Sequence, residues 1–193
     1  MPAIEIPERF QLTPKQFDRL APANETVRLE LTAQGELLVM PPTGSGTSGR
    51  SARITAQLTV WADRDGRGKA FDSSGMYALP NGARRSPDAS WVELSRWQAL
   101  TAEEQESFAP LAPDFVIELA SPSDLEVQRY ADLQAKMHEY IDNGTRLGWL
   151  IEPQTQRVEI YRPGQQATIR EAPQTLSGED VLPGFELDLS AIW

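Results

Sequence analysis

The stretch Asp114-Phe115-Val116-Ile117-Glu118-Leu119 decides the fold. From Phe115 to Ala120 the sequence predicts a strand that is apolar on both faces, apart from Glu118. A strand of this kind lies inside a sheet whose two faces are both covered. A carboxylate in such a strand is costly unless a cation, a hydrogen-bond network or a metal compensates its charge. Glu118 therefore needs an explanation that hydrophobic packing does not provide.

A second acid and a lysine lie on either side of this strand in the sequence. Asp88 stands in Ser86-Pro87-Asp88-Ala89-Ser90, at the start of another expected strand. Lys136 stands in Lys136-Met137-His138-Glu139-Tyr140, within a helix that we expect over residues 125–143. The apolar stripe of that helix consists of Tyr130, Leu133, Met137, Tyr140 and Ile141. Gly144 follows, where a helix-ending glycine is favoured.

The rest of the pattern mixes local hairpins with strand–helix–strand crossovers. Helices are expected to start at Thr13 and Thr101, and another carries Ile54, Leu58 and Trp61 after a flexible loop over residues 41–49. The expected strands cover residues 27–31, 36–40, 71–79, 88–92, 147–151 and 157–161, with weaker ones near 168–170 and 185–189. The sequence therefore predicts an α/β (α+β) fold in which a mixed central β-sheet is flanked by helices, and residues 1–193 form a single domain.

Composition excludes several classes of protein and of site. The chain has 193 residues, 40% of them hydrophobic, which indicates a folded globular protein. It has no cysteine, which excludes disulfides and thiolate chemistry, and its single histidine, His138, argues against a histidine-built zinc site. The net charge of −10 argues against a protein that coats nucleic acid generally, although a local basic groove stays open. Without a signal-peptide pattern or a membrane-length apolar run, we expect a cytoplasmic protein with no membrane contact.

Asp88 and Glu118 are the first candidates for chemistry. If their strands are neighbours, the two side chains converge on one hard cation, because such cations prefer carboxylate and carbonyl oxygens. The backbone carbonyl of Leu119 would be a natural third ligand. The alternative is that Asp88 caps a strand and Glu118 pairs with an arginine in the core.

Lys136 and Glu30 add to this pair, and each has a plain alternative. Lys136 lies to one side of its helix's apolar stripe, where its stem can follow the sheet and its ammonium can orient or deprotonate water, or neutralise developing charge. The alternative is a solvated lysine that pairs with Asp132. Glu30 lies in the apolar sequence Leu29-Glu30-Leu31 and could hold a second metal or a water near the metal, or could face solvent on an ordinary hairpin.

Three other features receive plainer interpretations. The loop over residues 44–50 lacks the ending of a phosphate-binding P-loop and is interpreted as a connector. His138 is interpreted as a surface residue, and Ser121-Pro122-Ser123-Asp124 as a cap of the long helix. Arg84 and Arg85 form the best local basic pair for a phosphate backbone, with two solvated arginines on a turn as the alternative.

A set of short motifs along nearly the whole chain resembles the Uma2 family, also known as DUF820, of the PD-(D/E)xK nuclease superfamily. The matching residues are Leu29-Glu30, Gly35-Glu36-Leu37, Met40-Pro41-Pro42-Thr43-Gly44, Phe71-Asp72-Ser73-Ser74, Ser86-Pro87-Asp88-Ala89-Ser90-Trp91-Val92, Pro113-Asp114-Phe115-Val116-Ile117-Glu118, Ser121-Pro122-Ser123, Leu133-Gln134-Ala135-Lys136-Met137, Gly148-Trp149-Leu150-Ile151 and Leu182-Pro183-Gly184-Phe185. The resemblance implies a restriction-endonuclease-like core and hydrolysis of DNA phosphodiester bonds with Mg²⁺ or Mn²⁺.

The resemblance also implies roles for individual residues. Asp88 matches the first acid of the motif and Glu118 the second, so both would bind the metal. The superfamily's usual lysine position, two residues after the second acid, holds Ala120 here. Lys136 resembles the relocated lysine of this family, and Glu30 matches its early acid.

Three functions therefore compete at the level of sequence. The first is a metal-dependent DNA endonuclease, which needs a local positive groove. The second is a non-catalytic binding or assembly module of nuclease fold, which fits the acidic charge better. The third is a metal hydrolase of smaller phosphoesters, which needs an enclosed pocket. Trp193 and a hairpin over residues 147–161, expected at a sheet edge, favour a homodimer, whose two-fold symmetry would suit a duplex cutter.

Overall fold

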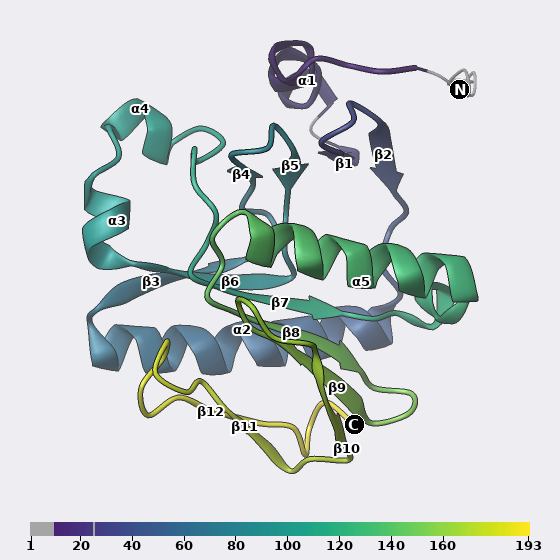
Figure 1. Ribbon diagram of the computed structural model, residues 1–193, viewed down its shortest axis with the longest axis vertical. Coiled ribbons are helices and arrows are strands. Elements are labelled where there is room, and N and C mark those ends of the chain that lie inside the picture. The colour runs from purple at the N-terminus through teal and green to yellow at the C-terminus, as the bar shows by residue number, and fades with distance from the viewer. Residues whose placement is uncertain (1–9, 25) are drawn as a thin grey trace.

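A six-stranded mixed sheet forms the centre of the computed structural model, which describes residues 10–24 and 26–193 (Figure 1). Its strand order is β10-β9-β8-β7-β6-β3. The strands are β3 (Gly68–Asp72), β6 (Ala89–Glu93), β7 (Phe115–Leu119), β8 (Leu147–Glu152), β9 (Arg157–Tyr161) and β10 (Thr168–Glu171). Only β7 and β8 pair in parallel, and the other neighbours are antiparallel. The predicted mixed sheet is confirmed.

The two parallel strands form the buried middle of the sheet. Every residue of β7 and β8 is buried, as expected for strands covered on both faces. The chain crosses from β7 to β8 through η2 (Pro122–Leu125), a short 3₁₀ turn, and α5 (Val127–Asp142). The sequence predicts this long helix over residues 125–143, so its position is confirmed to within two residues at each end.

Helices cover the two faces of the central sheet and leave Glu118 on a defined side (Figure 1). α2 (Ser45–Asp65) packs on one face with the small pair β11 (Thr175–Ser177) and β12 (Glu186–Asp188), and α5 packs on the other. Phe115, Ile117 and Leu119 belong to the α2 side of the core, whereas Val116 and Ala120 belong to the α5 side. Because side chains alternate along a strand, Glu118 points toward α5.

A second, four-stranded sheet lies beyond α5 (Figure 1). Its order is β2-β1-β5-β4, and its strands are β1 (Arg28–Leu31), β2 (Leu37–Met40), β4 (Tyr77–Ala78) and β5 (Arg84–Arg85). On one face of β1, Leu29 and Leu31 pack against Phe17 of α1 (Pro14–Leu20). The alternating residues Arg28 and Glu30 therefore face the other way, toward α5.

Short helices complete the fold and confirm two predicted helix starts. They are η1 (Pro22–Asn24), α3 (Leu94–Gln98) and α4 (Ala102–Gln105). α1 begins with a capping box between Thr13 and Gln16, and α4 with one between Thr101 and Glu104. None of the helices within the described ranges has both the length and the apolar character that crossing a membrane requires.

Two local predictions are wrong because the signals that support them are ambiguous. The loop predicted over residues 41–49 ends early, since α2 already begins at Ser45. Its first residues are Ser, Gly and Thr, which have low helix propensity, and the helix is held there by the packing of its later turns. The turn predicted to cap the long helix forms the separate η2, with its own capping box between Ser121 and Asp124.

The features expected to drive self-association lie elsewhere than predicted. The hairpin β8–β9 is not at a sheet edge, because β10 pairs with the outer side of β9. Trp193 is half-buried against the core, and its indole N–H donates to the carbonyl of Pro173 at 3.1 Å. Neither feature is therefore an exposed apolar surface.

Close packing between β3 and β6 generates a stability prediction. A Cβ atom on Gly68 would lie 2.2 Å from the Trp91 ring and 2.4 Å from the Val92 carbonyl oxygen. Gly68→Ala should therefore lower the free energy of unfolding by about 1–3 kcal/mol or more, measured by urea unfolding. The matched control is Gly49→Ala in α2, where a Cβ meets nothing within 4 Å. It should be neutral or stabilising by up to about 1 kcal/mol, and equal losses from both variants would contradict the prediction.

Candidate active site

Asp88 and Glu118 lie opposite each other on adjacent strands. Asp88 immediately precedes β6, and Ala89 pairs with Ile117 in the antiparallel ladder, so the next position places Asp88 across from Glu118. The Asp88 side chain is 21% exposed, whereas that of Glu118 is 5% exposed. The two candidate acids are thus brought together at the end of the central sheet, one of them open to solvent.

Lys136 joins this pair from α5. Its Nζ lies 2.8 Å from Oε1 of Glu118 and 3.0 Å from Oε1 of Glu30, and its side chain is buried. One helical turn further on, the hydroxyl of Tyr140 donates to the same Glu118 oxygen at 3.1 Å. The alternative of a solvated Lys136 paired with Asp132 is therefore wrong.

Glu30 links the small sheet to this network. Its Oε1 accepts hydrogen bonds from the backbone N–H of Ser86, at 3.0 Å, and from Lys136. Its Oε2 lies 3.2 Å from Nη1 of Arg85, whose Nε in turn donates to Glu139 of α5. Glu30 is 1% exposed, so the alternative in which it faces solvent on a hairpin is wrong.

The arginine pair Arg84 and Arg85 divides between two sides of the small sheet. Arg85 enters the buried network, whereas Arg84 makes a two-pronged ion pair with Asp18 at 2.8 and 2.9 Å. Both guanidiniums are thus paired with carboxylates. The arginines are therefore neither a solvated pair on a turn nor a pair free to bind a phosphate backbone, which are the two interpretations that the sequence suggests. His138 is exposed, as predicted, with its ring against Tyr161.

Neighbouring opposite charges set the protonation of Glu30 and Lys136. Burial alone would raise the pKa of Glu30, but the charges of Lys136 and Arg85, with the hydrogen bonds from Lys136 and Ser86, lower it. Burial would likewise lower the pKa of Lys136, but the charges of Glu118 and Glu30 raise it. Glu30 is therefore a carboxylate and Lys136 an ammonium at neutral pH.

Glu118 and Asp88 differ from Glu30, because their pKa values are raised. Burial raises the pKa of Glu118 to about 7. The charge of Lys136 lowers this pKa, and the negative charges of Asp88 and Glu30 offset part of that lowering. Burial also raises the pKa of Asp88, against a hydrogen bond from Leu119 and the charges of Lys136 and Arg28. In both carboxylates, burial therefore outweighs the pKa-lowering effect of the neighbouring positive charges.

The free oxygens of this pair fit a hard divalent cation. Oε2 of Glu118 accepts no hydrogen bond from the described residues, and Oδ1 of Asp88 has only the Arg28 guanidinium, 3.6 Å away. The N–H of Leu119 donates to Oδ2 of Asp88 at 2.9 Å, and the carbonyl of the same residue points to the same edge of the strand. Two carboxylates and a carbonyl suit Mg²⁺, which usually keeps several waters and takes one or two carboxylates from the protein.

No complete metal cage is present in the part of the chain that the structure describes. Among these residues there is no group of three or more His, Cys, Asp or Glu placed to hold a metal. Glu30, the third acid nearby, already has both oxygens bound by Ser86, Lys136 and Arg85. Glu30 therefore has no free oxygen with which to bind the second metal that the sequence suggests for it.

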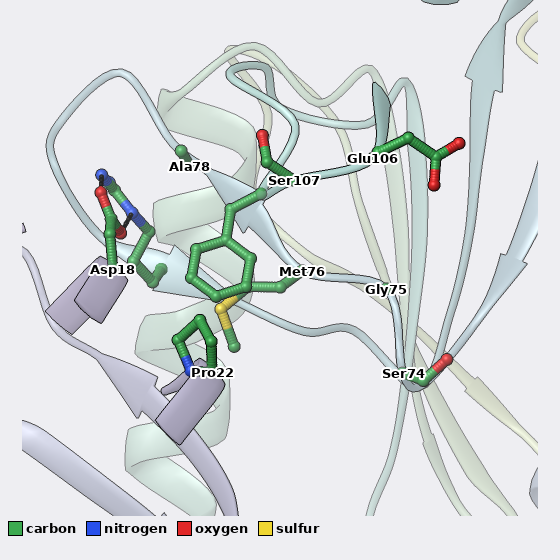
Figure 2. Close-up of a pocket in the computed structure, with 10 residues that line it drawn as sticks. Asp18, Pro22, Ser74, Gly75, Met76, Ala78, Glu106 and Ser107 are labelled. Carbon is green, nitrogen blue, oxygen red and sulfur yellow. Dashed lines mark hydrogen bonds and ion pairs between the residues drawn. The ribbon is translucent and has the colours of Figure 1, made fainter. Parts of the chain in front are cut away.

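Two cavities of the structure lie away from these acids. A cavity of about 500 Å³ lies on the α1 side of the small sheet, and Figure 2 shows the residues that line it. It is lined by Asp18, Pro22, Ser74, Gly75, Met76, Ala78, Arg84, Glu106, Ser107 and Phe108. A second cavity, of about 440 Å³, lies beside the β1–β2 turn. Neither contains Asp88, Glu118 or Lys136, so the acids do not line either hollow.

Sequence reasoning missed several members of the network: Arg28, Arg85 as an internal partner, Ser86, Glu139 and Tyr140. Two of them carry a usable signal. Arg28 lies two residues before Glu30, so strand alternation places both on one face. Tyr140 lies four residues after Lys136, so helical spacing places both on one face.

Removing the cation that joins Glu30 and Glu118 tests the network. Lys136→Met should lower the free energy of unfolding by about 3–5 kcal/mol near pH 8, because it leaves Glu118 as an unpaired buried charge. The loss should be smaller near pH 5, because the folded variant then keeps a proton on Glu118 that removes the charge. For an acid whose folded-state pKa is raised, stability falls as pH rises above the pKa of the unfolded chain.

Urea unfolding at both pH values measures this difference. The control is Lys15→Met on the exposed side of α1, which should change stability by less than about 0.5 kcal/mol at either pH. A loss for Lys136→Met that is small, or that stays equal at both pH values, would contradict the assignment of Lys136 as the neutralising cation.

Comparison with known proteins places the chain in a family. The sequence matches, over residues 14–190, the family Uma2, described as "Putative restriction endonuclease". No curated protein sequence matches the chain. Among solved structures, the fold is similar to a crystal structure from Anabaena variabilis ATCC 29413, described as "a putative nuclease belonging to DUF820". The TM-score is 0.76 at 20% sequence identity, and the match covers 94% of this chain and 97% of that one.

The structural likeness shows a shared nuclease-like fold, and the family match extends over nearly all of the sequence. The family match confirms the resemblance to Uma2 that the short sequence motifs indicate. The chain belongs to the Uma2 family.

Proposed function

We propose that this protein is a Mg²⁺-dependent endonuclease that hydrolyses phosphodiester bonds in DNA. The observation that carries the proposal is the pair of under-neutralised acids, Asp88 and Glu118, with the ammonium of Lys136 only 2.8 Å from Glu118. Perturbed carboxylates beside a fixed cation are typical of hydrolytic sites. The family description supports a nuclease in general terms.

Asp88, Glu118 and the carbonyl of Leu119 are the groups that would hold the divalent cation. When bound, Mg²⁺ or Mn²⁺ would supply Lewis-acid stabilisation of a phosphoryl oxygen and a more acidic water. Asp88 also accepts the N–H of Leu119, which fixes its carboxylate beside that carbonyl. The proposed ligand set therefore consists of three oxygens, two from carboxylates and one from a backbone carbonyl.

Lys136 would act as a fixed positive charge. Two of its three N–H donors contact Glu30 and Glu118, so one remains to orient a water or a phosphate oxygen. Because its pKa is raised, Lys136 is better suited to stabilising developing negative charge than to removing a proton. Glu30 would hold Lys136 in position instead of binding metal.

The competing functions receive unequal support. A hydrolase of small phosphoesters would need an enclosed pocket around the acids, and neither cavity described above includes them. A non-catalytic module is favoured by the net charge of −10 and by the full pairing of Glu30. It does not explain why Asp88 and Glu118 lack equivalent partners.

A homodimer and a single domain remain part of the proposal. In the homodimer, each active site would cut one strand of the duplex. The single domain would extend over residues 1–193.

Cleavage of plasmid DNA with Mg²⁺ or Mn²⁺ tests the activity directly. Wild type should nick the plasmid only with metal, and Asp88→Asn and Glu118→Gln should lose at least about 100-fold in rate. Lys136→Arg, which keeps the charge, should retain more activity than Lys136→Met. The matched control is Asp142→Asn, an exposed acid at the end of α5, which should cleave like wild type.

The outcomes separate the functions. Wild type that binds Mn²⁺ but cleaves no DNA, even at large protein excess, would point to the binding module. Activity that survives in the Asp88 or Glu118 variant would remove these residues from the mechanism.

The raised pKa of Glu118 predicts how metal binding depends on pH. A cation can bind only when Glu118 has lost its proton, and that pKa is about 7 without metal. Mn²⁺ affinity should therefore rise about tenfold per pH unit up to about pH 7 and level off above it. Isothermal titration calorimetry over this range measures the affinity and the released proton. An affinity that stays flat across the range would show that no proton leaves Glu118 on binding.

A further inference from the structure

Arg28 lies beside the candidate metal ligand Asp88, and the described residues do not satisfy all of its hydrogen-bond donors. Its Nη2 donates to the carbonyl of Ser86 at 3.1 Å and lies 3.6 Å from Oδ1 of Asp88, beyond hydrogen-bond distance. Its Nε is buried and finds no partner in the described part of the chain. The guanidinium thus keeps donors and charge that the observed contacts do not satisfy.

Exposure distinguishes Arg28 from the other cations of the network. The described residues bring three cations, Arg28, Arg85 and Lys136, to four carboxylates. The Arg85 and Lys136 side chains are each 9% exposed, whereas that of Arg28 is 33% exposed. Arg28 is therefore the member of this cationic set that an incoming polyanion can reach most easily.

Asp88 is the group on which Arg28 and a divalent cation compete. The positive charge of Arg28 helps to lower the pKa of Asp88, against burial. A cation bound to Asp88 would take over that neutralisation and leave the guanidinium beside a new positive charge. A phosphate group is the partner that a guanidinium in this position favours, since its donors match phosphate oxygens in a two-pronged geometry.

We propose that Arg28 is the residue that binds the substrate phosphodiester: it stands in as the counter-ion of Asp88 without metal, and donates to a phosphate oxygen when the metal is bound. This inference rests on the proposed function of the same site. It adds a substrate-binding residue that neither the motif residues nor the cavities indicate.

A structural role is the main competing explanation. Arg28 holds the carbonyl of Ser86 while Glu30 holds its N–H, so the two β1 residues fix the turn that leads to Asp88. If that were its whole role, losing Arg28 would disorder Asp88 and weaken both metal and DNA binding. The phosphate-binding role predicts opposite signs, because removing a positive charge beside Asp88 strengthens cation binding.

The experiment therefore measures two affinities on the same variants. Mn²⁺ binding to the metal-free protein is measured by calorimetry. Binding of a short labelled DNA duplex is measured in Ca²⁺, which accepts the same oxygen ligands. Arg28→Met should bind Mn²⁺ roughly three- to tenfold more tightly and DNA at least about tenfold more weakly than wild type. Arg28→Lys keeps the charge but loses the two-pronged donor geometry of the guanidinium. It should bind Mn²⁺ like wild type and DNA with intermediate affinity.

Arg64→Met is the matched control, because this exposed arginine lies in the last turn of α2. It should leave both affinities unchanged, and thermal unfolding checks that each variant is folded. Weaker binding of both ligands by Arg28→Met would overturn the proposal in favour of the structural role. Tighter Mn²⁺ binding with unchanged DNA binding would reduce Arg28 to a counter-ion and also overturn it.

The same measurements separate this inference from the proposed function. If wild type binds no Mn²⁺, or if Asp88→Asn binds it as well as wild type does, the metal site fails and the role of Arg28 fails with it. If wild type binds Mn²⁺ and DNA but Arg28→Met equals it in both, only the role of Arg28 is overturned.

Discussion

The ammonium of Lys136, held between Glu118 and Glu30, joins three parts of the structure. Glu118 belongs to the central sheet, Glu30 to the small sheet and Lys136 to the helix between them. Each of the three charges is buried, and none would be tolerated there alone. The position of the small sheet on α5 and the chemistry of the candidate site therefore depend on the same ion pairs.

Much of the architecture could be predicted because it follows from local pattern. The buried strand β7, the stripe of α5 and the caps at Thr13 and Thr101 are each set by neighbouring residues, and each is present where the pattern predicts it. The start of α2 could not be predicted in this way, since its Ser- and Gly-rich first turn has low helix propensity and depends on packing of the later turns. The interior position of β8–β9 depends on β10, a strand with a weak signal of its own.

The candidate site likewise has a part that could be predicted from local pattern and a part that could not. The convergence of Asp88, Glu118 and Lys136 could be anticipated from strand order and helical spacing, together with the family motif. The partners of Glu30 could not, because Ser86 and Arg85 reach it only through the pairing of β1 with β5, more than fifty residues away in sequence. Sequence spacing gives no measure of such contacts. Strand alternation places Arg28 on the same face as Glu30, but it does not show that the guanidinium lies beside Asp88.

The imbalance of charge in this network is what makes a hydrolytic role physically reasonable. With one more buried cation, Asp88 and Glu118 would be fully neutralised, and a divalent ion would gain little by binding between them. With one fewer, the acids would hold protons at neutral pH and could not act as metal ligands without losing them. The observed arrangement lies between these limits. Glu30 has partners at both oxygens and Glu118 at one. Asp88 accepts the N–H of Leu119 at one oxygen, while Arg28 stays 3.6 Å from the other. The buried carboxylates thus hold Lys136 at the inner end of the site. Positive charge is deficient at the outer end, where the partly exposed Asp88 would be accessible to the proposed metal and its phosphate-bearing substrate.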